Sequence, residues 1–243
     1  MARLLACAPF AYLAIETSSG PHVTPLLFAF THDRLWFGIG RGTLKARVLA
    51  KRPGVAVVVP GESSSVAIRG AATLVDRVPP ASELARAPFA LPAFAGRNTL
   101  EMAAFARDVV KRGAPARPLA PVSVSVGTVE LLEGWPAPAV LGWMALGGPI
   151  ALPARWRPQT DRALVSAAPL RAAGGPRSAA ACVCIDESEG LGPLAKGGRL
   201  LRGQGRATLR GEVASVAITV ERVTRWKGFT TRTDAAPTGS ESF

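Results

Sequence analysis

Histidine and cysteine are scarce in this chain of 243 residues, which has two histidines and three cysteines. A histidine-rich zinc site is excluded, because His22 and His32 are the whole supply. The cysteines cannot form a disulfide framework. Cys182 and Cys184 lie in the apolar run 179–185, where strand alternation places both thiols on one face, a pattern typical of buried cysteine. The G-x-S-x-G elbow of Ser-His-Asp hydrolases is also absent.

Charged residues are few as well, at 19% of the chain, whereas apolar residues make up 48%. A typical domain has about 25% charged residues, so the composition indicates a compact globular protein. The length suits one large or two small domains. The net charge is +12, but the arginines are scattered and form no stripe with aromatic residues. We therefore expect a solvated basic surface that attracts an anionic ligand, and no nucleic-acid partner.

Neither of two apolar segments has the features of a membrane span. Residues 135–154 are uncharged, but four prolines in this segment would break a spanning helix. Residues 1–15 resemble a signal peptide, yet Pro9 interrupts the apolar stretch and no convincing cleavage site follows. We expect a cytoplasmic protein with no membrane partner.

A faint internal repeat is the main positive signal. The pair Gly20-Pro21 is echoed by Gly148-Pro149 and the pair Asp33-Arg34 by Asp161-Arg162, with one offset, since 148 − 20 and 161 − 33 both give 128. Residues 70–74 are echoed by 205–209. Val129-Glu130 and Trp135 are echoed by Val220-Glu221 and Trp226, where the offset is 91. The common order predicts a duplicated unit that forms a two-fold pair within one chain.

The pattern of the first copy predicts a series of short strands with a helix between them. Thr43 is a candidate N-cap for a helix over 43–51, and Arg52-Pro53-Gly54 ends it. An alanine-rich insertion occupies about 80–113 and has helical spacing over 100–111. The strands are expected at 11–17, 22–30, 35–39, 55–59, 65–75 and 122–132.

The second copy repeats this scheme in outline. Its strands are expected at 150–156, 163–167, 178–185, 199–210 and 212–226. The segment 135–154 is interpreted as the connection between the copies, running into the first of these strands. The predicted domains are therefore 1–136 and 140–233, and the Gly-, Ser- and Pro-rich tail 234–243 is predicted to be disordered.

The first copy resembles a known family in the order of its motifs. A G-P-x-V-x-P strand, a D-R-L-W-F strand, the loop and helix start G-R-G-T-L-K-A-R, an R-P-G-V-A-V-V-V strand and an R-G-A-A strand follow one another between Tyr12 and Asp76. This order is similar to that of the pyridoxamine 5'-phosphate oxidase-like, FMN-binding split β-barrels. The resemblance implies a mainly β fold with short helices. It further implies two tandem six-stranded Greek-key split β-barrels, an intrachain pseudo-dimer, with the flavin at their interface.

The residues of one loop suit the phosphate of FMN. Arg41, Thr43 and Lys45 offer two cations and a hydroxyl among flexible glycines at a helix start, where a phosphate is readily bound. The resemblance assigns phosphate binding to Lys45. An ordinary strand-to-helix turn with a surface lysine would have the same sequence.

The resemblance also implies further contacts with the cofactor. The strand along the ring edge matches Val23, Thr24, Pro25 and Leu26, and the end of the neighbouring strand matches Gly38 and Ile39. Trp226, with Lys227 or Arg232, would close over the ligand from the second copy.

The second copy has no counterpart of the phosphate loop. Between the expected strands only 167–177 remains, without a Gly-x-Gly-Thr, and Arg171 is the candidate to replace Lys45. The sequence therefore predicts one cofactor site per chain, with the second barrel as its wall.

Three functions stay open at this point. The first is an FMN-dependent oxidoreductase acting on a small organic substrate, in which the ring carries the chemistry and no acid or base is obligatory. The second uses a deazaflavin, whose long anionic tail would suit the basic surface. The third is a cofactor-free binding or structural protein that kept only the fold. Haem binding is disfavoured, because neither histidine has a supporting motif.

Overall fold

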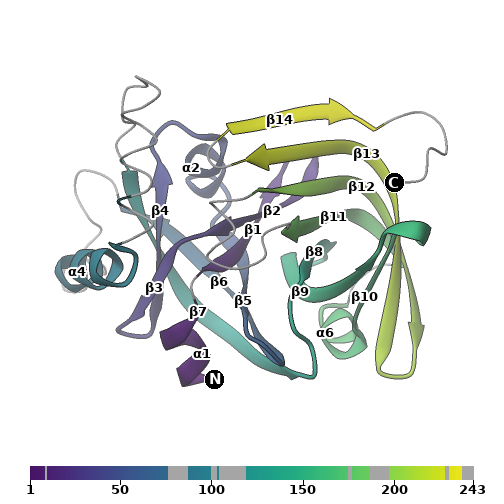
Figure 1. The fold of residues 1–243 in the computed structure, drawn as a ribbon, viewed down its shortest axis with the longest axis horizontal. Coiled ribbons are helices and arrows are strands. Elements are labelled where there is room, and N and C mark those ends of the chain that lie inside the picture. Colours follow the sequence, from purple (N-terminus) through teal and green to yellow (C-terminus); the bar gives the residue numbers. More distant parts are fainter. Residues whose placement is uncertain are drawn as a thin grey trace.

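The computed structural model describes residues 1–8, 10–75, 87–99, 103, 119–174, 177–186, 197–227 and 230–236. They form two seven-stranded antiparallel sheets, one from each half of the chain. Figure 1 shows the sheets side by side, with β1–β7 in purple to teal and β8–β14 in green to yellow. The predicted fold class, tandem split β-barrels with short helices, is confirmed.

The two strands at the ends of the first sheet are consecutive in the sequence, so the chain itself joins these ends. Its strand order is β2-β1-β5-β6-β7-β4-β3, so β2 and β3 stand at opposite ends although only Leu27 separates them. The single strand expected over 22–30 is therefore two strands. The bounds are β1 (Ala11–Thr17), β2 (Gly20–Leu26), β3 (Phe28–Thr31), β4 (Arg34–Gly40), β5 (Gly54–Pro60), β6 (Ser64–Leu74) and β7 (Leu119–Glu133).

The second sheet closes by hydrogen bonding, since β10 pairs with both β9 and β13. Its order is β10-β9-β8-β11-β12-β13-β14. The bounds are β8 (Ala139–Ala145), β9 (Gly148–Arg157), β10 (Arg162–Ser166), β11 (Ser178–Asp186), β12 (Gly198–Arg210), β13 (Val213–Lys227) and β14 (Thr230–Ala235).

Two predictions about the second copy need correction. Strand β8 lies in the segment that was interpreted as a connection. It is buried along almost its whole length, so it lacks the alternation by which a half-buried strand is recognised. Strand β14 runs to Ala235 and so includes the first two residues of the tail predicted to be disordered. Residues 237–243 lie outside the described residues.

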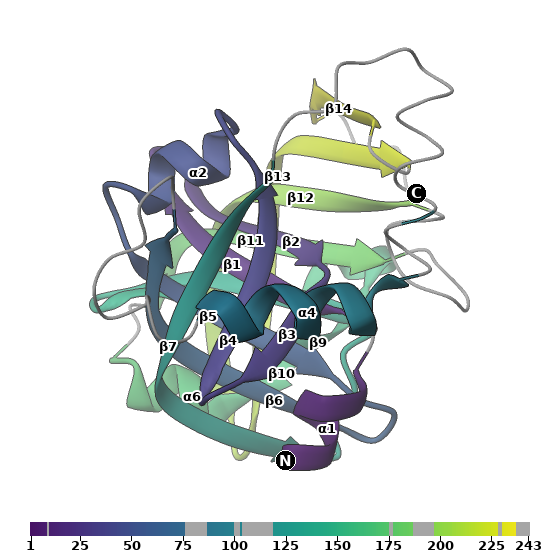
Figure 2. The same ribbon diagram turned by 90° about the vertical axis from the view of Figure 1, so that its left-hand side faces the viewer.

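The helices are short. They are α1 (Ala2–Cys7), α2 (Leu44–Leu49), α4 (Ala87–Arg97), α6 (Ala167–Ala172) and the 3-10 turn η1 (Pro158–Thr160). Helix α4 falls in the predicted insertion and crosses β3 and β4, as Figure 2 shows. Most of the helix expected over 100–111 lies outside the described residues. No helix among the described ranges is long and apolar enough to span a membrane.

The early echoes of the repeat occupy equivalent positions. Gly20 pairs with Thr17 at the β1–β2 turn, and Gly148 pairs with Ala145 at the β8–β9 turn. Asp33 and Asp161 both have a positive φ, of 57° and 47°, just before β4 and β10. The offset of 128 residues therefore relates equivalent positions of the two barrels.

The later echoes in the sequence do not pair structurally equivalent residues of the two barrels. Each long hairpin has a bulge after an arginine, Arg69 in β6 and Arg202 in β12. The next residue must be glycine, because a Cβ on Gly70 or Gly203 would lie 1.9 Å from a backbone carbonyl oxygen of the partner strand. Gly203, and not Gly205, is thus the counterpart of Gly70.

The same register changes which residue of the first copy corresponds to Trp226. Trp226 pairs with Gly198, four residues before Arg202. Four residues before Arg69 is Ser65, which pairs with Leu132. Leu132, rather than Trp135, is therefore the counterpart of Trp226.

The barrels meet through β1, β2 and β5 on one side and β8, β9 and β11 on the other. Each barrel has its own core, and a third cluster fills the interface. A Cβ on Gly142 would lie 2.7 Å from Val23 and 2.8 Å from the Cys182 sulfur, so this glycine lets the barrels approach closely. The interface cluster consists of Tyr12, Ala14, Val23, Ala56, Val58, Val140, Ala151, Cys182, Cys184 and Leu200.

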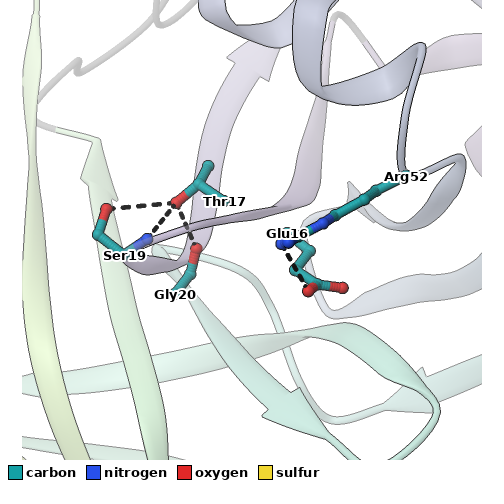
Figure 3. A network of polar contacts seen from close by, with 5 residues as sticks. All are labelled: Glu16, Thr17, Ser19, Gly20 and Arg52. Atoms are coloured by element: carbon teal, nitrogen blue, oxygen red, sulfur yellow. Dashed lines mark hydrogen bonds and ion pairs between the residues drawn. The ribbon is translucent and has the colours of Figure 1, made fainter.

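The β1–β2 turn is fastened beside this interface, as Figure 3 shows. The Thr17 hydroxyl donates to the Gly20 carbonyl at 2.7 Å and accepts from the Ser19 amide at 3.3 Å. Arg52, which follows α2, donates to the Glu16 carboxylate at 2.8 Å. These contacts hold the start of β2 and the end of α2 against β1, so both elements stand in a fixed position for the site described next.

Candidate cofactor site between the two barrels

Strand β2 presents unpaired polar atoms beside the barrel interface. Its side chains alternate, and Val23 packs in the interface cluster. His22 and Thr24 are on the opposite face of the strand. His22 Nδ1 and Thr24 Oγ1 are both buried without a hydrogen-bond partner. Buried polar atoms are rarely left unpaired, so these two indicate a ligand.

The predicted phosphate loop lies between β4 and α2. Gly42 has a φ of +71° and open space around it, a backbone conformation that glycine adopts without strain. Thr43 caps α2, because its Oγ1 accepts from the Ala46 amide at 3.4 Å, as the sequence predicted. The Thr43 hydroxyl can still donate its proton to an anion.

Lys45 lies in the first turn of α2 and is mostly buried. Burial lowers the pKa of its ammonium to about 8, partly offset by Cys184, which favours the charged form. Within the described part of the chain no carboxylate forms an ion pair with Lys45. A buried ammonium without a counter-ion is unfavourable in itself and is typical of an anion site.

The second barrel brings a further cation to this place. Burial, followed by the positive charges of Lys45 and Arg202, lowers the pKa of His22 to about 3. Arg202 belongs to β12, which contacts β2. One guanidinium nitrogen of Arg202 donates to Thr224 Oγ1 at 3.2 Å, but its Nε is buried without a partner. Three basic side chains from α2, β2 and β12 therefore converge.

Two thiols and a tyrosine are buried in the interface cluster. Cys182 and Cys184 lie two residues apart on β11 and are fully buried at the interface, as their alternation predicted. Burial raises the pKa of both thiols. Tyr12 donates to a carboxylate oxygen of Asp186 at 3.5 Å, and burial followed by the charges of Cys184 and Asp186 raises the pKa of the Tyr12 hydroxyl. In the described chain there is no group of side chains that could hold a metal ion.

Trp226 packs against the interface cluster from β13. Its indole lies on Gly198, where a Cβ would be 2.3 Å from the ring. The indole N–H is buried and has no acceptor. Trp226 therefore offers an unpaired hydrogen-bond donor beside the interface, and its predicted contact with a cofactor stays a prediction.

The predicted site residues divide into two groups. Val23, Thr24, Lys45 and Trp226 lie at or beside the interface, and Arg41 and Thr43 form the loop next to Lys45. Pro25 is buried on β2 and pairs with Tyr12.

The other three predicted side chains point elsewhere. Leu26 packs against the core of the first barrel, and Ile39 belongs to that core. Gly38 faces α4, with the Phe94 ring 3.4 Å from an ideal Cβ. These residues could meet a cofactor through their backbone alone. Arg171 does not replace Lys45: it is in the last turn of α6 and donates to the Gly211 carbonyl, and Ala168 holds the second position of the helix.

Sequence reasoning missed two members of the cluster, His22 and Arg202. Alternation with Thr24 could have placed His22 on the face of β2 that carries Thr24. Nothing in the sequence joined Arg202 to them, because β12 meets β2 through the docking of one barrel on the other.

The donor set fits a flavin nucleotide. The phosphate would meet Lys45, Arg41 and the Thr43 hydroxyl, with Arg202 on the facing barrel. The polar rim of the ring would meet Thr24 and the Trp226 N–H, whose buried atoms lack partners. Such a group would supply acceptors for these unpaired atoms and a negative charge beside Lys45.

Comparisons with known proteins gave similar solved structures and a family match. A search of curated proteins found no match. Similar solved structures include an FAD-binding protein from Mesorhizobium loti, with 16% identity and a TM-score of 0.39 over 54% of this chain and 89% of that one. An FAD-binding protein from Mycobacterium smegmatis has 18% identity and a TM-score of 0.35, covering 53% and 88%. An F420 reductase has 19% identity and a TM-score of 0.36, covering 53% and 94%.

The family comparison concerns the first barrel. Residues 1–115 match the family model described as pyridoxamine 5'-phosphate oxidase. The same residues contain β1–β6, α2 and the loop before it. The part of the chain that carries the candidate phosphate loop is therefore similar to the pyridoxamine 5'-phosphate oxidase family.

Proposed function

We propose that this protein is a flavin-dependent oxidoreductase that binds one FMN per chain between its two barrels. The supporting observation is the buried group of unpaired polar atoms around Lys45, drawn from both barrels. A cofactor-free protein would gain nothing from burying these groups, because each unpaired polar atom destabilises the fold by about 1–3 kcal/mol.

In this proposal the two barrels have different tasks. The first barrel holds the phosphate with Lys45, Arg41 and Thr43 at the start of α2. The second barrel excludes water and meets the ring with Trp226. When bound, the flavin supplies the electron-transfer chemistry, and the protein positions it against a small organic substrate.

Titration of the purified protein with FMN tests this proposal. Bound flavin is expected to shift the visible bands and quench the flavin fluorescence, with saturation near one equivalent per chain. Reduction of an artificial electron acceptor by the loaded protein, with a reduced nicotinamide as the electron donor, would then establish oxidoreductase activity. Failure to bind FMN or a deazaflavin would refute the proposal and favour a cofactor-free protein.

A deazaflavin is the second candidate cofactor, and one observation favours it. On β12 and β13, Arg202 lies directly opposite Arg222. Like charges in cross-strand pairs are destabilising. Burial, followed by the charge of Arg222, lowers the pKa of Arg202. This pair of arginines lies on the two strands that lead to Gly198 and Trp226, and it would suit a long anionic tail.

Competition separates the two cofactors. If the protein uses a deazaflavin, the native deazaflavin should bind more tightly than its form without the anionic tail, and Arg222→Gln should reduce that difference. If the protein uses FMN, Arg222→Gln should leave FMN affinity nearly unchanged, since the phosphate lies at α2.

A further inference from the structure

His22 is the buried titratable group of the site to which neither the family match nor the resemblance gives a role. It lies on β2, which contacts β12, and the positive charges of Lys45 on α2 and Arg202 on β12 both act on it. Its Nδ1 is buried and has no hydrogen-bond partner. A neutral imidazole in this position leaves a ring nitrogen unsatisfied, and an imidazolium would repel two neighbours.

The acidic groups near the site are engaged elsewhere. Asp186, at the end of β11, accepts from the Tyr12 hydroxyl at 3.5 Å. Glu16, on β1, forms an ion pair with Arg52 at 2.8 Å. The two thiols of β11 are held neutral by burial. Among the described residues, the charges that act on His22 are thus those of Lys45 and Arg202, both positive.

We propose that His22 binds the anionic group of the cofactor as an imidazolium, so that anion binding takes up a proton at this residue. The inference rests on the proposed function in that the anion is the flavin phosphate. In the free protein His22 is neutral, because burial and two cations oppose its protonation. A dianion between Lys45 and Arg202 cancels their repulsion and accepts the hydrogen bond that Nδ1 can then donate.

Proton uptake can be measured by calorimetry of FMN binding at pH 6.0 in two buffers of different protonation enthalpy. If the bound His22 recovers at least its ordinary pKa of about 6.5, more than about half a proton is taken up by this residue. His22→Gln keeps the size and polarity of the side chain but cannot titrate. Since the FMN phosphate, which itself titrates near pH 6, contributes in both proteins, the difference between them reports His22.

Riboflavin, which lacks the phosphate, is the matched ligand. We expect wild type to take up more than about half a proton more than His22→Gln with FMN, and no such difference with riboflavin. Equal proton uptake by the two proteins with FMN would overturn the role of His22 while leaving flavin binding intact. A difference that persists with riboflavin would also overturn it, because the coupling would not depend on the anion.

A second ligand and a second variant keep the test decisive. If no flavin binds, the proposed function fails, and inorganic phosphate becomes the probe. If wild type takes up a proton on binding phosphate and His22→Gln does not, the anion site is supported. If wild type takes up no proton with phosphate, the role of His22 is overturned. If His22→Gln does not fold, His22→Asn, which cannot titrate either, replaces it in the comparison with wild type.

Discussion

The duplication gives the strand and helix residues of the cofactor site counterparts in the opposite barrel, and strand register and helix position identify them. Two residues after the turn glycine stands His22 in the first copy and Ile150 in the second. The second helical position holds Lys45 in α2 and Ala168 in α6. The remaining counterparts are Val58 for Cys184, Leu132 for Trp226 and Arg69 for Arg202.

The two sets differ in polarity, and the loop explains why. In the first copy three residues separate β4 from α2, whereas α6 begins at Ala167 directly after β10 ends at Ser166. Without the loop there is no amide cradle and no lysine at the helix start. The one cation of the second set, Arg69, donates to the Gly147 carbonyl at 3.1 Å. One of the two equivalent places thus carries the proposed anion site, and the other has mostly apolar residues and an arginine that is already engaged.

The largest expected effect is at Lys45. Lys45→Met removes a buried cation from the proposed phosphate contact, which is worth roughly 1.5–3 kcal/mol. FMN affinity should fall at least about tenfold, measured by flavin fluorescence. The melting temperature without ligand should rise, because the variant no longer buries an unpaired ammonium.

Arg171→Ala is the matched control in the second barrel. It removes a cation from α6, so it should leave both FMN affinity and the stoichiometry of one unchanged. A loss of affinity in Arg171→Ala equal to that in Lys45→Met, or saturation at two equivalents, would show that the copies are functionally alike.

The second expected effect is a loss of FMN affinity at alkaline pH. The pKa of Lys45 is lowered to about 8 in the free protein, so the ammonium is lost as pH rises above 8. FMN affinity should therefore fall by up to about tenfold per pH unit between 8 and 9.5. Titrations across this range should show no such decline in Lys45→Arg, whose guanidinium stays charged.

A smaller effect is expected at Trp226, whose counterpart is apolar. Trp226→Phe keeps the aromatic wall and removes an N–H that has no partner in the protein. FMN affinity should fall about two- to tenfold, the range of one neutral hydrogen bond of 0.5–1.5 kcal/mol. The unfolding temperature of the ligand-free protein should hardly change. Equal affinities in a fluorescence titration would place the cofactor away from the second barrel.

The smallest effect is expected at Arg69. Arg69→Gln removes an exposed hydrogen bond to Gly147, so the free energy of unfolding should fall by no more than about 1 kcal/mol. FMN affinity should not change. Weaker binding in this variant would mean that the second set of residues also holds a cofactor.

Local signals in the sequence were enough for much of the fold. Strand β1 was predicted with its observed bounds, and Thr43 was predicted as the cap of α2. Both depend on side chains within a few residues of one another. The equivalence of Gly20 with Gly148 could be read for the same reason, since turn glycines are fixed by the local backbone.

Where the structure differs from the prediction, the difference is caused by contacts between residues that are distant in the sequence. Strand β8 is buried on both faces, so its pattern carried no period. The counterpart of Trp226 depends on where the bulge at Arg202 falls, which a faint repeat could not fix.

Short runs of neighbouring residues were enough to indicate the duplication, the loop of the first copy that suits a phosphate, and the loss of this loop from the second copy. The influence of Arg202 on His22, from 180 residues further along the chain, follows only from the fold. Strands β2 and β12 meet because the two barrels dock through the faces of β1, β2 and β8, and no local propensity encodes the docking.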